Sequence, residues 1–75
     1  MLEVDLNVPD LEVGQNVALS CSKFGHVASV KVHRTPSAFA LIEMANREQT
    51  SELAASYGGS TFGTCALIHL QQKPA

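Results

Sequence analysis

The sequence has few of the residues on which the more easily recognised classes of protein depend. It contains no tryptophan, one tyrosine and three phenylalanines, and seven acidic residues outnumber five lysines and arginines, which gives a net charge of −2. This balance excludes the strongly basic surface of a domain that holds nucleic acid mainly through phosphates. Two cysteines in 75 residues exclude a disulfide-rich scaffold, and Cys21 and Cys65 match no usual zinc-ligand spacing.

Long hydrophobic runs are also missing. The longest is far shorter than the roughly 20 apolar residues that cross a bilayer, and the acidic N-terminus does not resemble a secretory signal. We therefore expect no membrane association and an intracellular location, in the nucleus or the cytoplasm. A chain of 75 residues has room for one small domain, which we assign to residues 1–72, with a tail at residues 73–75.

Motifs that carry catalytic or cofactor chemistry are not found. No serine lies in a nucleophile motif, and neither cysteine has a catalytic pattern beside it. The glycine-rich segment 58–63 follows a helical segment instead of preceding one, unlike a loop that cradles phosphate. We expect no enzymatic activity, no cofactor, no metal site and no small-molecule substrate.

Hydrophobic periodicity predicts four strands. Apolar residues alternate with polar ones in two segments and are nearly continuous in two others. In chain order the expected strands are residues 2–8, 26–34, 38–44 and 65–70.

Helical spacing marks the two segments between these strands. Residues 11–23 have Asp10 as a candidate N-cap, and residues 47–56 begin after Asn46 or Ala45. Cys21 falls on the inner face of the first helix, where we expect it in the core. The order strand, helix, strand, strand, helix, strand favours an α+β fold, with four antiparallel strands and two helices on one face.

Two local sequences resemble the RNA recognition motif (RRM). Ser22–Val27, Ser-Lys-Phe-Gly-His-Val, is similar to the end of that family's first helix, and Ser37–Met44, Ser-Ala-Phe-Ala-Leu-Ile-Glu-Met, occupies the place of the octamer on its third strand. The likeness covers essentially the whole chain and is similar in style to the branch typified by the polypyrimidine-tract-binding protein. It implies a ferredoxin-like βαββαβ sandwich with the strand order 4-1-3-2, and a role in a ribonucleoprotein or in RNA processing.

The octamer departs from the family pattern at positions that contact RNA. Ser37 replaces a basic residue and Leu41 a second stacking aromatic, while Glu3 or Asp5 stands on the first strand where another aromatic is usual. Phe39 then remains as the one stacking ring, so the resemblance implies weak binding of single-stranded RNA, helped by neighbouring domains. The residues expected to take part are Phe39, Leu41, Lys31, Arg34, Leu67, His69, Lys73 and Asp5.

Ordinary structural roles stand beside these functional ones. Phe39 can instead cover the sheet, and Lys31 and Arg34 can be solvated strand residues. In the implied strand order His33 and His69 lie on opposite edges, too far apart to share a metal. The sequence leaves both kinds of role open.

Protein binding is the alternative function. Leu41 and Leu67 on the exposed sheet face would form an apolar patch for a partner, and the helical face offers a second surface. A peptide-capturing variant of this fold carries Arg-x-Phe before its last strand, and here Ser60 stands in place of the arginine in Ser60-Thr61-Phe62.

Overall fold

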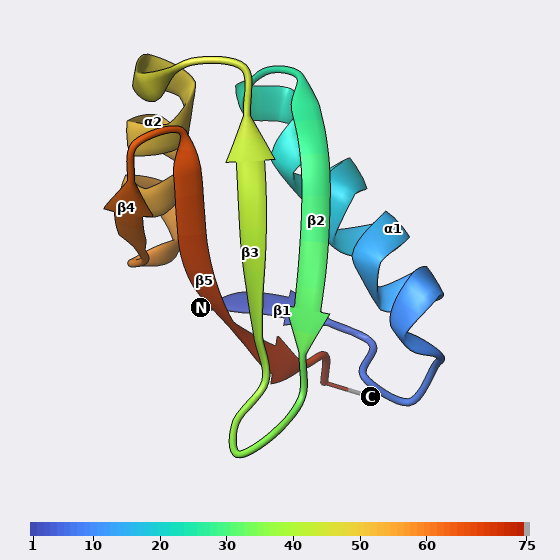
Figure 1. The fold of residues 1–75 in the computed structure, drawn as a ribbon. Helices are drawn as coiled ribbons and strands as arrows, with labels where there is room; N and C mark the ends of the chain where they lie inside the picture. Colours follow the sequence, from blue (N-terminus) through green and yellow to red (C-terminus); the bar gives the residue numbers. More distant parts are fainter. Residues whose placement is uncertain (75) are drawn as a thin grey trace.

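Two α-helices lie behind a mixed sheet of five strands in the α+β fold of this chain (Figure 1). The computed structural model describes residues 1–74. In chain order the elements are β1 (Leu2–Val4), α1 (Asp10–Cys21), a 3-10 turn η1 (Ser22–Phe24), β2 (Val27–His33), β3 (Phe39–Met44), α2 (Arg47–Tyr57), β4 (Ser60–Phe62) and β5 (Cys65–Gln72). The α+β class predicted from the sequence is confirmed.

Both helices begin and end close to the predicted positions. Asp10 is the first residue of α1 and Pro9 its N-cap, so Asp10 is not the cap that the sequence suggested. Asn46 caps α2 by accepting a hydrogen bond from the backbone N–H of Gln49 at 2.9 Å, and Gly58 ends this helix with a φ of 68°. Neither helix has the length and hydropathy needed to span a membrane, within the part of the chain that the structure describes.

The core lies between the helices and one face of the sheet. Alternate residues of β1, β3 and β5 are buried there, as a sheet with one covered face requires. Cys21 is fully buried, which confirms its predicted place in the core. The buried apolar residues are Leu2 and Val4 from β1, Val13, Val17 and Cys21 from α1, Ala40, Ile42 and Met44 from β3, Leu53 and Ala54 from α2, and Ala66, Ile68 and Leu70 from β5.

The sheet differs from the predicted four-stranded antiparallel sheet in strand number, direction and order. Its order is β1-β5-β3-β2, and β4, which is not among the four predicted strands, pairs with the other end of β5. β5 runs antiparallel to β3, with Phe39 opposite His69 and Glu43 opposite Cys65. β1 runs parallel to β5, with Leu2 opposite Leu70. The last strand therefore lies beside β3, where the order 4-1-3-2 would put the first.

The early end of β1 explains why β5, and not β1, lies beside β3. The alternation continues to Val8, but the strand stops at Val4, because the Asp5 carboxylate accepts a hydrogen bond from the Asn7 N–H at 2.9 Å and turns the chain. Leu6 and Val8 still pack against the core from this loop. The apolar residues of the alternating pattern are thus partly buried although they are not paired in a strand. With three residues, β1 is too short to form the five residue pairs that β5 makes with β3.

Candidate nucleic-acid interface

The sheet face turned away from the helices, which we call the open face, carries three rows of side chains. Residues directly opposite one another in an antiparallel ladder point to the same side of the sheet. The aromatic row is His33, Phe39 and His69; the leucine row is Lys31, Leu41, Leu67 and Ser60; the glutamate row is Ser29, Glu43, Cys65 and Phe62. The rows run across β2, β3 and β5, and the last two rows extend onto β4.

Three rings lie side by side in the aromatic row. The His33 and Phe39 rings are stacked, with centroids 4.8 Å apart and planes 12° apart. His69 meets Phe39 edge to face at 6.4 Å and 66°. The expectation that His33 and His69 lie on opposite edges is wrong, because β5 and not β1 is the neighbour of β3. The open face therefore offers a continuous aromatic surface, whereas the sequence predicted an isolated ring.

Acidic residues do not flank Phe39 in the way that the sequence suggested. Glu3 lies opposite Gln71, two residues beyond His69 on β5, so that β5 stands between it and Phe39, and Asp5 lies beyond β1 in the loop, with its carboxylate bound to the Asn7 N–H. The position beside Phe39 that was assigned to one of these carboxylates is held by His69. The structure thus separates Asp5 from Phe39 and places it beside the same hollow as Lys73, and no carboxylate stands in the aromatic row.

The leucine row brings together three more of the predicted site residues. Leu41 pairs with Lys31 on one side and with Leu67 on the other, and both leucines are partly exposed. Among the five lysines and arginines of the chain, Lys31 is the one that lies in a strand. The row therefore combines apolar surface with a single cation.

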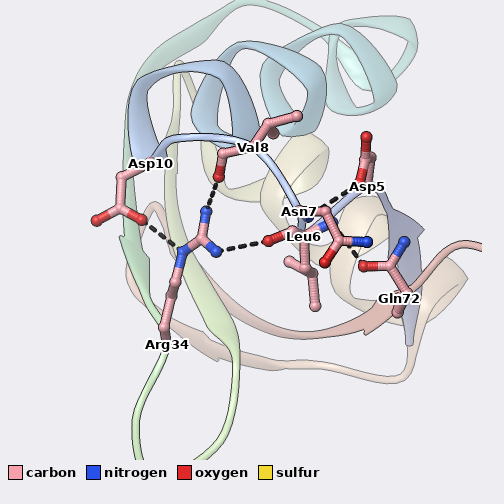
Figure 2. A network of polar contacts seen from close by, with 7 residues as sticks. All are labelled: Asp5, Leu6, Asn7, Val8, Asp10, Arg34 and Gln72. Atoms are coloured by element: carbon pink, nitrogen blue, oxygen red, sulfur yellow. Dashed lines mark hydrogen bonds and ion pairs between the residues drawn. The ribbon is translucent and has the colours of Figure 1, made fainter.

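Arg34 has a structural role in the loop that follows β1. Its Nε donates to the Asp10 carboxylate at 2.5 Å, Nη1 donates to the carbonyl of Leu6 at 2.6 Å, and Nη2 donates to the carbonyl of Val8 (Figure 2). These contacts tie residues 6–10 to the end of β2. A guanidinium held by these three contacts is turned from the open face. It is therefore not free to form a bidentate contact with a phosphate there.

Lys73 is also separate from the aromatic row. Its backbone N–H donates to the carbonyl of Val4 at 2.9 Å, which fastens the chain to β1 just after β5 ends. With Glu3 from β1 and Asn16 and Leu19 from α1, Lys73 lines a hollow at the β1 edge of the molecule. Of the eight predicted residues, the structure gathers Phe39, Leu41, Lys31, Leu67 and His69, and leaves Arg34, Lys73 and Asp5 elsewhere.

The residues of the glutamate row were not among the predicted site residues. Ser29, Lys31, Leu41, Glu43 and Cys65 line a hollow of about 200 Å³ on the open face. Burial raises the pKa of the Cys65 thiol, Glu43 raises it further and Lys31 opposes them, so both charged groups lie close to the thiol. Alternation along β3 places Glu43 on the same side as Phe39, but the pairing with Ser29 and Cys65 depends on strand order and register, which the sequence did not supply.

A second surface lies between α1 and β2. Two hollows of about 460 and 770 Å³ follow this groove, and they share Gln15, Ala18 and Val27 in their walls. Leu11 and Leu19 of α1 border them with 76% and 73% of their surface exposed, which is unusual for leucines of an amphipathic helix. This groove corresponds to the helical face named in the alternative function.

No protein-family model, curated protein or solved structure matches the chain. Within residues 1–74 no group of three or more His, Cys, Asp or Glu side chains is arranged to hold a metal ion.

Proposed function

We propose that the chain binds single-stranded RNA through the open face. The observation that carries the proposal is the aromatic row, in which His33, Phe39 and His69 form one surface across three neighbouring strands. Exposed aromatic rings on a sheet are the platform on which unpaired bases stack. The partly exposed leucines of the next row extend the apolar surface under a neighbouring nucleotide.

The fold is proposed to be a variant of the RNA recognition motif. Phe39 and Leu41 lie on a central strand and on the side away from both helices, which is where that family uses its octamer. The variation lies in the strand beside β3, which is β5 in this chain. Because β5 supplies His69, the exchange adds an aromatic ring at the position where the implied order would have put a carboxylate.

Stacking contributes most of the proposed affinity. A base stacked on an aromatic side chain is worth about 1 to 3 kcal/mol, whereas Lys31 alone can meet only one phosphate. For a single strand the logarithm of the binding constant falls with the logarithm of salt by about 0.7 for each phosphate contact. The proposal therefore implies modest affinity with little salt dependence, and tethering to a further RNA-binding domain would raise it.

Two phenylalanines of the open face allow a matched test. Phe39 lies in the aromatic row, and Phe62, which is 63% exposed, lies at the outer end of the glutamate row. Phe39→Ala is expected to weaken binding of a fluorescein-labelled uridine hexamer by about 1 kcal/mol or more, measured by anisotropy, because it removes the centre of the stack. Phe62→Ala is expected to change the affinity less than twofold. Equal affinities for Phe39→Ala and the unaltered protein would overturn the proposal.

Protein binding is a second candidate function, favoured by the exposed leucines beside the α1–β2 groove. An apolar segment of a partner would cover Leu11 and Leu19 there. This surface is on the helical side of the sheet, so Leu19→Gln is expected to leave RNA affinity unchanged. The two candidates therefore use separate surfaces and can be tested in the same samples.

A further inference from the structure

The hollow in the glutamate row has the polarity of a base-binding subsite. Leu41 and the Cys65 thiol provide apolar wall, while Lys31 and Glu43 provide a cation and a carboxylate on neighbouring strands. Its volume of about 200 Å³ is below the roughly 300 to 1,000 Å³ of pockets that enclose a whole small molecule. A hollow of this size accepts part of a larger ligand, such as one edge of a base.

The two charged groups in the hollow are available to a ligand. Within residues 1–74 the one ion pair is that of Arg34 with Asp10, so Lys31 and Glu43 line the same hollow without forming an ion pair. The Thr64 hydroxyl donates to Oε2 of Glu43, which fixes the direction of the carboxylate. Oε1 and the remaining lone pair of Oε2 can still accept hydrogen bonds.

We propose that this hollow binds the Watson–Crick edge of guanine, and the proposal rests on RNA binding by the open face. Guanine presents an acceptor, O6, next to two donors, N1–H and the N2 amine. Glu43 can accept from the two donors and Lys31 can donate to O6. Uracil offers one donor between two acceptors, and one of these would face the carboxylate. Adenine and cytosine each offer a single amine, so they pair with one carboxylate oxygen only.

The guanine subsite and the aromatic row lie on the same strand. Phe39 and Glu43 are separated by roughly 13 Å along β3. One short oligonucleotide can therefore place a base on the aromatic row and a guanine in the hollow. Stacking would supply affinity without sequence preference, and Glu43 with Lys31 would supply the preference.

Labelled uridine hexamers test this inference. The probes are the uridine hexamer and three pools in which a single guanine, adenine or cytosine occupies any internal position. The unaltered protein is expected to bind the guanine pool at least about fivefold more tightly than the other three, the lower end of what a two-point base contact gives. Equal affinity for all four probes would overturn the guanine subsite and leave RNA binding standing, whereas failure of every probe to bind would overturn both.

Two variants and a matched control identify the residues. Glu43→Gln puts an amide donor against the guanine donors, so it is expected to reduce the guanine preference to less than twofold. Lys31→Gln, at an exposed position that leaves the core untouched, is expected to reduce it partly. Glu3→Gln removes an acid on β1 and is expected to preserve the preference. A guanine preference that survives in both Glu43→Gln and Lys31→Gln would overturn the assignment.

Discussion

Cys21 is a buried thiol whose ionisation opposes folding. Its side chain is fully buried on the inner face of α1. Burial raises its pKa from the ordinary value of 9.0 to about 11, with a smaller opposing effect of Lys23. The thiol is therefore protonated and packed as a small apolar group at neutral pH.

The raised pKa of Cys21 predicts a loss of stability at alkaline pH. Below pH 9 the thiol is protonated in both the folded and the unfolded chain, and the stabilisation is fully present. Between about pH 9 and 11 the unfolded chain releases the proton while the folded chain keeps it, so the free energy of unfolding falls by roughly 2 to 3 kcal/mol. Urea unfolding at pH 8 and pH 11 measures this fall.

Variants at the two cysteines separate this effect from other alkaline titrations. Cys21→Ala removes the group and is expected to reduce the difference between pH 8 and pH 11. Cys65→Ala, at a partly exposed position of β5, is expected to keep most of it. The same loss of stability in Cys21→Ala as in the unaltered protein would exclude Cys21 as the cause.

The loop between β1 and α1 depends on one side chain from another element. Arg34 follows β2 and donates partly buried hydrogen bonds to the carbonyls of Leu6 and Val8. It also contacts the exposed carboxylate of Asp10. The carbonyl contacts count for more, because an ion pair with an exposed carboxylate is screened by solvent.

Replacing Arg34 is expected to destabilise the fold without changing RNA affinity. Arg34→Gln removes the two guanidinium nitrogens that donate to the carbonyls of Leu6 and Val8. We expect the free energy of unfolding to fall by about 1 to 2 kcal/mol in urea denaturation. Arg47→Gln, an exposed change on α2 with the same loss of charge, is the matched control and should change stability by less than about 0.5 kcal/mol. If Arg34→Gln instead weakens RNA binding at full stability, the guanidinium contacts RNA.

At the level of elements, the sequence predicted the positions of the helices but not where β1 ends. Local signals located α2, because Asn46 and Gly58 bound it through their own side-chain and backbone preferences, whereas α1 was located by its hydrophobic spacing although Asp10 is not its cap. The alternation from Leu2 to Val8 was correct about burial but not about pairing, since Leu6 and Val8 pack from a loop. Hydrogen bonds from Arg34, distant in the sequence, stabilise that loop, and alternation within one segment does not contain this information.

Strand order is the property of the whole molecule on which the open face depends. Phe39, Leu41 and Lys31 were predictable on one face from the alternation of β2 and β3 alone. The neighbours of β3 were not predictable, because either the first or the last strand satisfies the same periodic pattern. With β5 beside β3, His69 rather than a carboxylate meets Phe39 and Cys65 meets Glu43.

Nuclear Overhauser effects between strands test the order directly. We expect cross-strand contacts between Phe39 and His69 and between Leu41 and Leu67, because β3 and β5 are paired in this register. Residues 2–4 of β1 are expected to give strand contacts only to β5. Backbone contacts between β1 and β3 would contradict the order and would move a carboxylate next to Phe39.

The central claim is that single-stranded RNA binds on the open face, and an amide NMR titration of the labelled protein with pooled short RNAs tests it most directly. The account predicts that the largest shifts fall on His33, Phe39, Leu41, Leu67 and His69, while Leu19 in the α1–β2 groove does not move. Saturating RNA that leaves the aromatic row unchanged would contradict it.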